Sequence, residues 1–186
     1  VAWGATRSLK LVLATLLAFI ALGYLGMWDD TMKTLSMILV ATLLTIILGL
    51  PTGILLSRSN RLERVVNPVL DVMQTLPSFV YLIPVVMLLG IGRVPGIIAV
   101  IIYALPPVIR FANLGIRLIA KDAIEVADAF GASAWQKLTR VQLPLALPTI
   151  MAGINQSIML ALAMVVIAAM IGVPGLGQPV LRAINN

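Results

Sequence analysis

The sequence predicts an all-α integral membrane protein with about five membrane spans. Of the 186 residues, 61% are hydrophobic and only 11% are charged, whereas soluble domains have about 25% charged residues. The apolar residues also form runs long enough to cross a bilayer, because a helix needs about 20 of them to span a hydrocarbon core of about 30 Å. Water could not solvate so much apolar surface, so the solvent is expected to be lipid.

Five runs meet this length requirement. The third is polar at its start and apolar from Leu76 onward, and the fourth is broken by Pro106 and Pro107. Because the chain begins with Val1 rather than Met, we expect a fragment of a longer product. A single module is therefore expected over residues 1–186, with spans at residues 9–25, 35–56, 65–91, 94–118 and 145–171.

The Lys and Arg residues predict on which side of the membrane each loop lies. An N-terminus in the cytoplasm places ten of the thirteen basic residues on the cytoplasmic side, and the opposite orientation places three there. Cytoplasmic loops of membrane proteins carry an excess of Lys and Arg. The sequence therefore predicts a cytoplasmic N-terminus and a large cytoplasmic loop at residues 110–143.

The missing residue types exclude several classes of function. The chain has no Cys and no His, which excludes a disulfide framework, a thiolate or His-ligated metal site and a Ser-His-Asp triad. It also lacks a G-x-x-x-x-G-K-[ST] phosphate loop, so it does not bind ATP by that motif. The net charge of +6 is explained better by basic cytoplasmic loops than by nucleic-acid binding. We expect no catalytic residue, no metal and no nucleic-acid partner.

The loop at residues 121–144 is too polar to span a membrane and predicts two short amphipathic helices. Asp122 can cap the first helix, with Glu125 three residues later as its partner in a capping box. Ser133 and Gln136 have the same spacing at the start of the second helix. The two helices are therefore expected to lie on the cytoplasmic face.

A turn and an apolar surface complete this predicted loop. Gly131 can adopt the left-handed conformation that ends a helix, and Pro144 is expected to end the segment. The first helix presents an apolar surface made by Ala123, Val126, Ala127 and Phe130. Either this surface packs on the chain's own helix ends, or a soluble partner docks on it.

The same loop resembles the EAA signature of binding-protein-dependent ABC importer permeases. That signature reads Glu-Ala-Ala, three residues, Gly, nine residues, Ile, one residue and Leu-Pro, and the loop matches its spacing with Val126 and Val141 as conservative replacements. The resemblance implies a type I ABC importer transmembrane fold, in which this loop is the coupling element that sits in a groove of the ATPase subunit. Carried over, the docking residues are Glu125, Val126, Ala127, Phe130, Gly131, Ala132, Leu143 and Pro144. For Glu125, a role as a capping partner is the alternative, and the two roles can coexist.

Other segments resemble glycine betaine/proline permeases of that superfamily, namely residues 70–84, 103–107, 148–156 and 175–178. The resemblance covers most of residues 30–183. It implies import of quaternary ammonium solutes such as glycine betaine, proline betaine, choline or carnitine by alternating access. The family carries a further membrane helix after the Gly-Leu-Gly-Gln segment, which we expect to be absent or to belong to a missing part.

The resemblance also implies the partners of the chain. ATP and Mg²⁺ are expected in separate ABC ATPase subunits, so this chain would be a permease with no cofactor of its own. A second copy of the permease is expected, because five spans cannot enclose a generous polar path. An extracytoplasmic binding protein, separate or fused, is expected to select the solute, since 5% aromatic residues are too few for a high-affinity cation–π cage. The expected location is the cytoplasmic (inner) membrane of a bacterium or archaeon.

Polar and aromatic residues inside the spans are the candidates for the translocation path. Buried amides without partners are costly, so they must bond to other helices or line the path. The path candidates are Phe79, Tyr81, Tyr103, Asn155, Gln156 and Ser157. The alternative for the three aromatic residues is ordinary helix packing, and the alternative for the three polar residues is hydrogen bonding between helices. Gly49 and Gly53 have the spacing that lets helices approach closely, on either side of a kink at Pro51. Asp71 is a candidate to pair with Arg110.

Two other function classes lack the features they need. A secondary transporter would need an inverted repeat and usually intramembrane ionisable residues, and neither pattern is evident. An intramembrane enzyme would need a convergent nucleophile and base or a metal cluster. A channel-like or scaffold subunit without a transport cycle, and an ABC permease for another small solute such as an amino acid, stay open as alternatives.

Overall fold

The computed structural model describes residues 9–185, and every regular element in that range is a helix. The predicted all-α class is therefore confirmed for the described part of the chain. Arg7, which entered the orientation count, lies outside the described residues. The elements are α2 (Leu9–Tyr24), α3 (Trp28–Ser57), α4 (Asn60–Thr75), α5 (Phe79–Leu89), α6 (Arg93–Arg117), α7 (Lys121–Ala129), α8 (Ala134–Gln136), a π-turn (Lys137–Gln142), α9 (Leu143–Ala169) and α10 (Gly177–Asn185).

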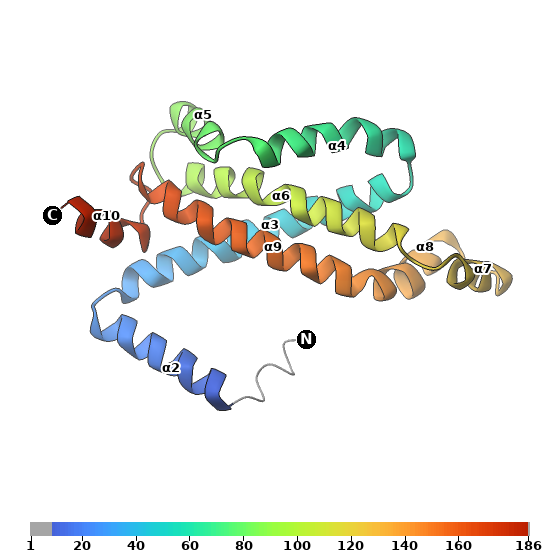
Figure 1. Ribbon diagram of the computed structural model, residues 1–186, viewed down its shortest axis with the longest axis horizontal. Helices are drawn as coiled ribbons and strands as arrows, with labels where there is room; N and C mark the ends of the chain where they lie inside the picture. The colour runs from blue at the N-terminus through green and yellow to red at the C-terminus, as the bar shows by residue number, and fades with distance from the viewer. Residues whose placement is uncertain (1–8, 186) are drawn as a thin grey trace.

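Helices α3, α6 and α9 form the bundle, with α6 packed against both of the others (Figure 1). The α4–α5 pair lies along one side of α6, whereas α2 diverges from the bundle and contacts little besides α3. Helices α7 and α8 lie at one end of the bundle, and α10 and the α2–α3 turn lie at the other (Figure 1). The loops that the charge pattern assigns to opposite sides of the membrane are thus at opposite ends of the molecule.

Three helices have the length and hydropathy of a membrane span: α3, α6 and the continuous helix Ala134–Ala169. The α4–α5 pair passes the same test only if it is counted as one span, and it is bent by 91°. Helix α2 is apolar but has only 16 residues. Five spans were expected, and three or four of them have helices of this kind in the described range.

The bend between α4 and α5 divides the stretch at 65–91 that we expected to be a single span. Pro77 has no N–H to continue the α4 ladder and disfavours helical angles at the residue before it. Leu76 accordingly has φ −71° and ψ 138°, an extended conformation, and ends α4. Helix α5 then restarts at Phe79 in a new direction.

The prolines of α6 do not break it, contrary to the sequence prediction. Pro106 and Pro107 lie inside the continuous helix α6 and are both fully buried. Helix-breaking residues are tolerated in membrane helices where neighbouring helices and Ser or Thr side chains satisfy the backbone. Ser157 of α9 donates its hydroxyl to the carbonyl of Ala104, at 2.8 Å, just before the proline pair.

Pro144 does not end its segment either. The helix that starts at Ala134 runs through Pro144 to Ala169 as one helix of 36 residues. A π-turn at Lys137–Gln142 precedes the proline, and the N–H of Leu143 bonds to the carbonyl of Leu138, five residues back. This wider turn accommodates the proline ring, which would clash with the carbonyl four residues earlier in a regular α-helix.

Small residues let α3 and α9 approach α6 closely. A Cβ atom on Gly53 would lie 2.5 Å from Cβ of Ala112 and 2.6 Å from the carbonyl oxygen of Ile109. A Cβ atom on Gly153 would likewise lie 2.5 Å from Cβ of Phe111. The predicted close packing around Gly49 and Gly53 is therefore confirmed, and its partner is α6.

Substitution of Gly53 by Ala should destabilise the bundle, because the added methyl group has no space between α3 and α6. Overpacking of this kind costs about 1–3 kcal/mol. Gly23→Ala in α2 is the matched control, since nothing lies within 4 Å of the added atom. We expect the thermal midpoint of the purified, detergent-solubilised chain to fall for Gly53→Ala only. Equal midpoints for the two variants would contradict the close approach.

Candidate functional site

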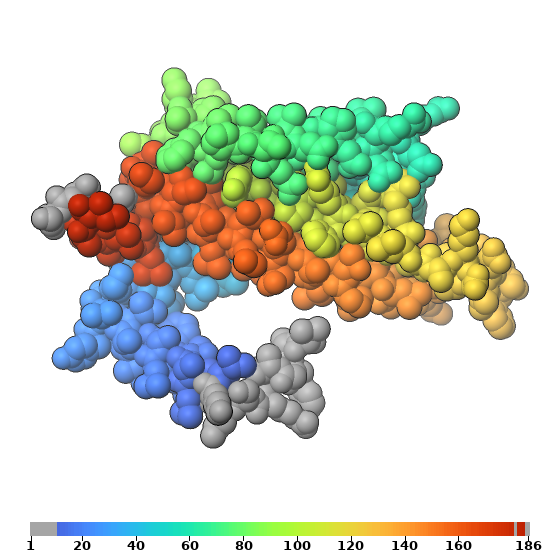
Figure 2. Space-filling view, viewed as in Figure 1, coloured from blue at the N-terminus to red at the C-terminus, as the bar shows by residue number. Residues whose placement is uncertain are grey.

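The polar loop forms an exposed hairpin that projects from one end of the bundle (Figure 2). Its first arm is the short helix α7, but its second arm, predicted as another short helix, is the start of the long helix Ala134–Ala169. Phe130 is 87% exposed and Trp135 is 70% exposed, an unusual state for large apolar side chains in a polar segment. Between α7 and the start of the long helix lies an open hollow of about 770 Å³. The hairpin therefore presents a concave, partly apolar surface away from the membrane-spanning part.

Gly131 produces the turn of this hairpin as predicted. Its φ is +71°, a left-handed conformation that glycine adopts without a steric cost. The N–H of Ala132 bonds to the carbonyl of Ala127 at 3.0 Å, and the N–H of Gly131 bonds to that of Asp128 at 2.9 Å. These two bonds make a Schellman motif, which satisfies the last carbonyls of α7.

One of the two predicted capping boxes is present. The hydroxyl of Ser133 accepts a bond from the N–H of Gln136 at 3.3 Å, and the Gln136 side chain accepts one from the N–H of Ser133 at 2.9 Å. The predicted cap at Asp122 is wrong, because α7 begins one residue earlier, at Lys121, with Ala120 as its N-cap. Asp122 instead lies in the first turn of α7, where a carboxylate interacts favourably with the helix dipole.

The hairpin is fastened to the long helix. Lys137 forms an ion pair with Asp128 of α7. Ala127 and Leu138 are buried, and Leu138 belongs to a cluster with Ala146 of α9. A force on the hairpin is therefore transmitted to α9 through a continuous helix and a packed contact.

The predicted docking residues divide into exposed and supporting positions. Glu125, Val126, Phe130, Gly131 and Pro144 are exposed. Ala127 is buried, and Ala132 and Leu143 are half-buried. These three residues therefore support the docking surface rather than form its exposed part. Ala123, which the sequence placed in the apolar surface of the first helix, also lines the hollow. The sequence interpretation did not assign four further lining residues to docking, namely Asp122, Gln136, Arg140 and Val141. The spacing of Gln136 and Arg140, one helical turn apart on the second helix, is the signal that could have indicated them.

The aromatic path candidates lie at the bend between α4 and α5. The rings of Tyr81 and Tyr103 are 6.2 Å apart and tilted by 54°, and Phe79 is exposed. The Tyr81 hydroxyl donates to the carbonyl of Met73 at 2.6 Å. That carbonyl is the one that the N–H of residue 77 would have bonded in a continuous helix, but Pro77 has none. Tyr81 therefore stabilises the bend.

The polar candidates of α9 differ from one another. Ser157 is fully buried and bonds to α6, whereas Asn155 and Gln156 are exposed on the described chain. Exposed amides at this depth must meet another protein surface or water, because lipid offers them no hydrogen bonds. The positions of Asn155 and Gln156 are compatible both with bonding to another helix and with lining the path, the two roles that the sequence left open.

A polar network fastens the α3–α4 turn to the end of α6 near the hairpin. The Asn113 amide donates to Glu63 at 2.8 Å, and the Arg117 guanidinium contacts the carboxylate of Glu63 at 3.1 Å. Arg117 also donates to Asn113 at 2.9 Å, to the side chain of Asn60 at 2.7 Å and to the carbonyl of Leu56 at 3.0 Å. The expected pairing of Asp71 with Arg110 is present one to two turns further into the bundle.

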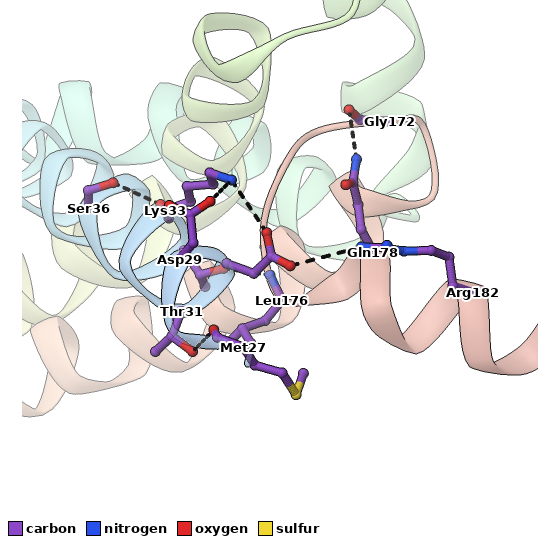
Figure 3. Close-up of polar contacts among 11 residues, drawn as sticks. Met27, Asp29, Thr31, Lys33, Ser36, Gly172, Leu176, Gln178 and Arg182 are labelled. Carbon is purple, nitrogen blue, oxygen red and sulfur yellow. Dashed lines mark hydrogen bonds and ion pairs between the residues drawn. The ribbon is translucent and has the colours of Figure 1, made fainter. Parts of the chain in front are cut away.

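A second polar cluster holds the opposite end of the bundle together (Figure 3). The N–H of Leu176 donates to the hydroxyl of Thr34 at 2.8 Å, so the segment after α9 is bonded to the first turns of α3. Lys33 pairs with Asp29 and, at 3.6 Å, with Asp30. Asp30 also lies 4.0 Å from Arg182 of α10.

The fold and the exposed hairpin define a helical membrane protein of the transporter permease class. Residues 46–186 match the family described as "Binding-protein-dependent transport system inner membrane component". The chain belongs to this family, as the EAA-like loop predicted. It is therefore a multi-pass membrane component of a transport system.

Two relatives are similar over almost the whole chain. The glycine betaine/proline betaine transport system permease protein ProW of Escherichia coli (strain K12) is 57% identical over 173 residues, which is 93% of this chain and 49% of ProW. The glycine betaine transport system permease protein OpuAB of Bacillus subtilis (strain 168) is 50% identical over 184 residues, which is 99% of this chain and 64% of OpuAB. The chain thus spans 49% to 64% of the length of these relatives.

Two solved structures share the fold. One shows inward-facing conformations of the MetNI methionine ABC transporter, with a TM-score of 0.74, 24% identity and coverage of 82% of this chain and 77% of that chain. The other is an amino acid ABC transporter with histidines, with a TM-score of 0.70, 18% identity and coverage of 90% and 83%. These likenesses confirm the predicted type I ABC importer transmembrane fold.

Tyr81→Phe should loosen the bend between α4 and α5, because the carbonyl of Met73 loses its hydrogen-bond donor. A lost hydrogen bond of this kind costs about 1 kcal/mol. Tyr103→Phe is the control, since among residues 9–185 the Tyr103 hydroxyl has no hydrogen-bond partner while its ring packs on that of Tyr81. We expect a lower thermal midpoint for Tyr81→Phe than for Tyr103→Phe. The opposite order would show that the hydroxyl of Tyr81 does not stabilise the bend.

Proposed function

We propose that this chain is the translocating subunit of an ATP-driven importer of compatible solutes, of the glycine betaine, proline betaine, choline or carnitine class. The exposed hairpin of α7 and α8 at the end of the α6–α9 pair carries this proposal, because it is a docking surface mechanically joined to the spans. The names of the relatives ProW and OpuAB support the solute class. An ABC permease for an amino acid is the second candidate, favoured by the names of the two structural neighbours.

The proposed occupant of the hollow is an ABC ATPase subunit. Phe130, Trp135 and Val126 leave an apolar surface in water, and such surfaces are typical of protein interaction sites. Glu125 and Arg140 at its margins can form charged contacts with a partner. Because the chain has no phosphate-loop motif, ATP and Mg²⁺ are assigned to that partner, and this chain supplies no cofactor site.

The proposed cycle couples the two ends of the molecule. Closure of two ATPase subunits on ATP displaces the docked hairpins, and each hairpin moves α9 because they share one continuous helix. The path then alternates between inward and outward access, as a two-state equilibrium biased by ATP. The aromatic residues Phe79, Tyr81 and Tyr103 and the α9 residues Asn155, Gln156 and Ser157 are the proposed path positions.

Two further partners belong to the proposal. A second copy of the permease is expected, with the path between the copies, because the few spans of one chain cannot enclose a generous polar path. The exposed amides of Asn155 and Gln156 also need a protein or water partner that lipid cannot supply. An extracytoplasmic binding protein, separate or fused, delivers the solute to the end that carries α10. The assembly resides in the cytoplasmic membrane of a bacterium or archaeon.

Uptake in cells tests the solute class. Cells that lack other osmolyte systems and produce this importer should take up labelled glycine betaine at high osmolarity, in a manner that requires ATP and the partner ATPase. The control is the same importer with an ATPase that cannot hydrolyse ATP. Import of an amino acid without any betaine or choline uptake would overturn the solute class and favour the second candidate.

Gly131→Leu tests the coupling role of the hairpin. A left-handed conformation costs a non-glycine residue roughly 1–2 kcal/mol, and no atom lies within 4 Å of the added Cβ, so the change acts on the turn alone. We expect the variant to reach the membrane but to retain less ATPase subunit on purification and to import more slowly.

The matched control for this variant is Gly26→Leu. Gly26 also has a left-handed φ, +68°, and no atom within 4 Å of an added Cβ, but it lies at the opposite end of the bundle. It should keep the ATPase subunit bound. If Gly131→Leu and Gly26→Leu retain the ATPase equally well, the hairpin is not the coupling element.

A further inference from the structure

The ion pair between Asp71 of α4 and Arg110 of α6 lies on the helical bundle. The sequence placed Arg110 at the start of a cytoplasmic loop, but α6, which has the length and hydropathy of a membrane span, continues through Arg110 to Arg117. Arg110 precedes the end of α6 at Arg117 by seven residues, or about 10 Å of helix. The side chains of Arg110 and Asp71 are nevertheless 34% and 62% exposed. Charged groups at membrane depth face a bundle interior or a water-filled cavity rather than lipid. This face of α4 and α6 is therefore turned toward water or protein in the assembled importer.

The pair borders a cavity of about 260 Å³ between α4 and α6. Its walls are Asn67, Asp71, Arg110, Asn113 and Leu114, so four of its five lining residues are polar. Asn113 is already engaged on both sides of its amide, by Glu63 and Arg117. The groups that can meet a solute are thus one carboxylate, one guanidinium and the amide of Asn67.

Arg110 has donors to spare, unlike its neighbour Arg117. Asp71 contacts it through a single oxygen, Oδ1, on a single nitrogen, Nη2. Within residues 9–185, Nε of Arg110 is buried and has no hydrogen-bond partner. A guanidinium has five N–H donors and commonly binds a carboxylate through two of them. The ion pair with Asp71 therefore uses only some of the hydrogen-bond donors of Arg110.

We propose that this cavity is a transit site for zwitterionic solutes on the cytoplasmic half of the path. The carboxylate of the solute binds Arg110 in place of Asp71, while its quaternary ammonium group lies against Asp71. A zwitterion replaces both halves of the ion pair, so neither residue is left as an uncompensated charge, which would be costly at this depth. The inference rests on the proposed function and narrows its solute class to zwitterions such as glycine betaine.

The test uses the intact importer, with its ATPase and binding protein, reconstituted in proteoliposomes. Labelled glycine betaine is the probe, and ATP hydrolysis is measured in parallel at saturating solute. Arg110→Gln should lower the betaine imported per ATP hydrolysed by about tenfold, the effect of losing roughly 1.4 kcal/mol of binding to the transported solute. Arg110→Lys keeps a cation for the carboxylate and should retain most of this ratio.

Two further variants distinguish a role of the ion pair in solute transit from a role in protein stability. Arg61→Gln removes an exposed Arg from the same helix, α4, outside the cavity, and should leave the ratio unchanged. The double variant Asp71→Leu with Arg110→Leu removes both charges together, so neither residue is left as a lone charge. It should assemble and hydrolyse ATP but import little betaine.

The outcomes distinguish failure of the proposed transit site from failure of the proposed function. An active wild-type importer whose Arg110→Gln and double-leucine variants keep the wild-type ratio overturns the transit site alone. So does a loss in which uptake and hydrolysis fall by the same factor in both variants, since that is the mark of a purely structural pair. A wild-type importer that takes up no betaine overturns the proposed function and the transit site with it.

Discussion

The close approach of α6 to α3 and α9 is the constraint on which the rest of this structure depends. In lipid, helices gain little from burying apolar surface against one another, so association relies on tight packing and interhelical bonds. Gly53 on one side of α6 and Gly153 on the other leave no room for a Cβ atom. The hydrogen bond from the Ser157 hydroxyl to the carbonyl of Ala104 strengthens the contact between α9 and α6, close to the buried proline pair. Helix α6 is thereby fixed between α3 and α9 and forms the centre of the bundle.

In the proposed coupling, this arrangement is how a small hairpin acts on the rest of the molecule. Helices α7 and α8 connect the end of α6 to the start of α9, so the hairpin is attached to both members of one of the two most extensively packed pairs. The π-turn before Pro144 keeps the connection between the hairpin and α9 helical. A break at this proline would have made that connection flexible. On the other side of α6, the α4–α5 pair is held by the Glu63–Arg117 contact and by Asp71–Arg110, which are polar and exchangeable.

Sequence patterns predicted the features that depend on neighbours along the chain. Gly131 and the Ser133–Gln136 box act within a few residues, and both are present. The predictions that failed depend on tertiary surroundings. Whether the prolines of α6 break their helix is decided by the helices packed around them. The pairing of Asp71 with Arg110 could be suggested from the sequence, but the cavity beside it requires the relative placement of α4 and α6. The bend after α4 was missed although Pro77 indicates it, because the apolar run continues across it.

The central claim is that the α7–α8 hairpin is a cytoplasmic surface covered by an ATPase. The most direct measurement is the labelling rate of a cysteine at Phe130, which would be the only thiol in this cysteine-free chain and replaces a side chain that is 87% exposed. With a membrane-impermeant thiol reagent, we predict no labelling in intact cells, rapid labelling in inside-out vesicles that lack the ATPase, and slow labelling when the ATPase is bound. Labelling in intact cells, or equal rates with and without the ATPase, would contradict the account.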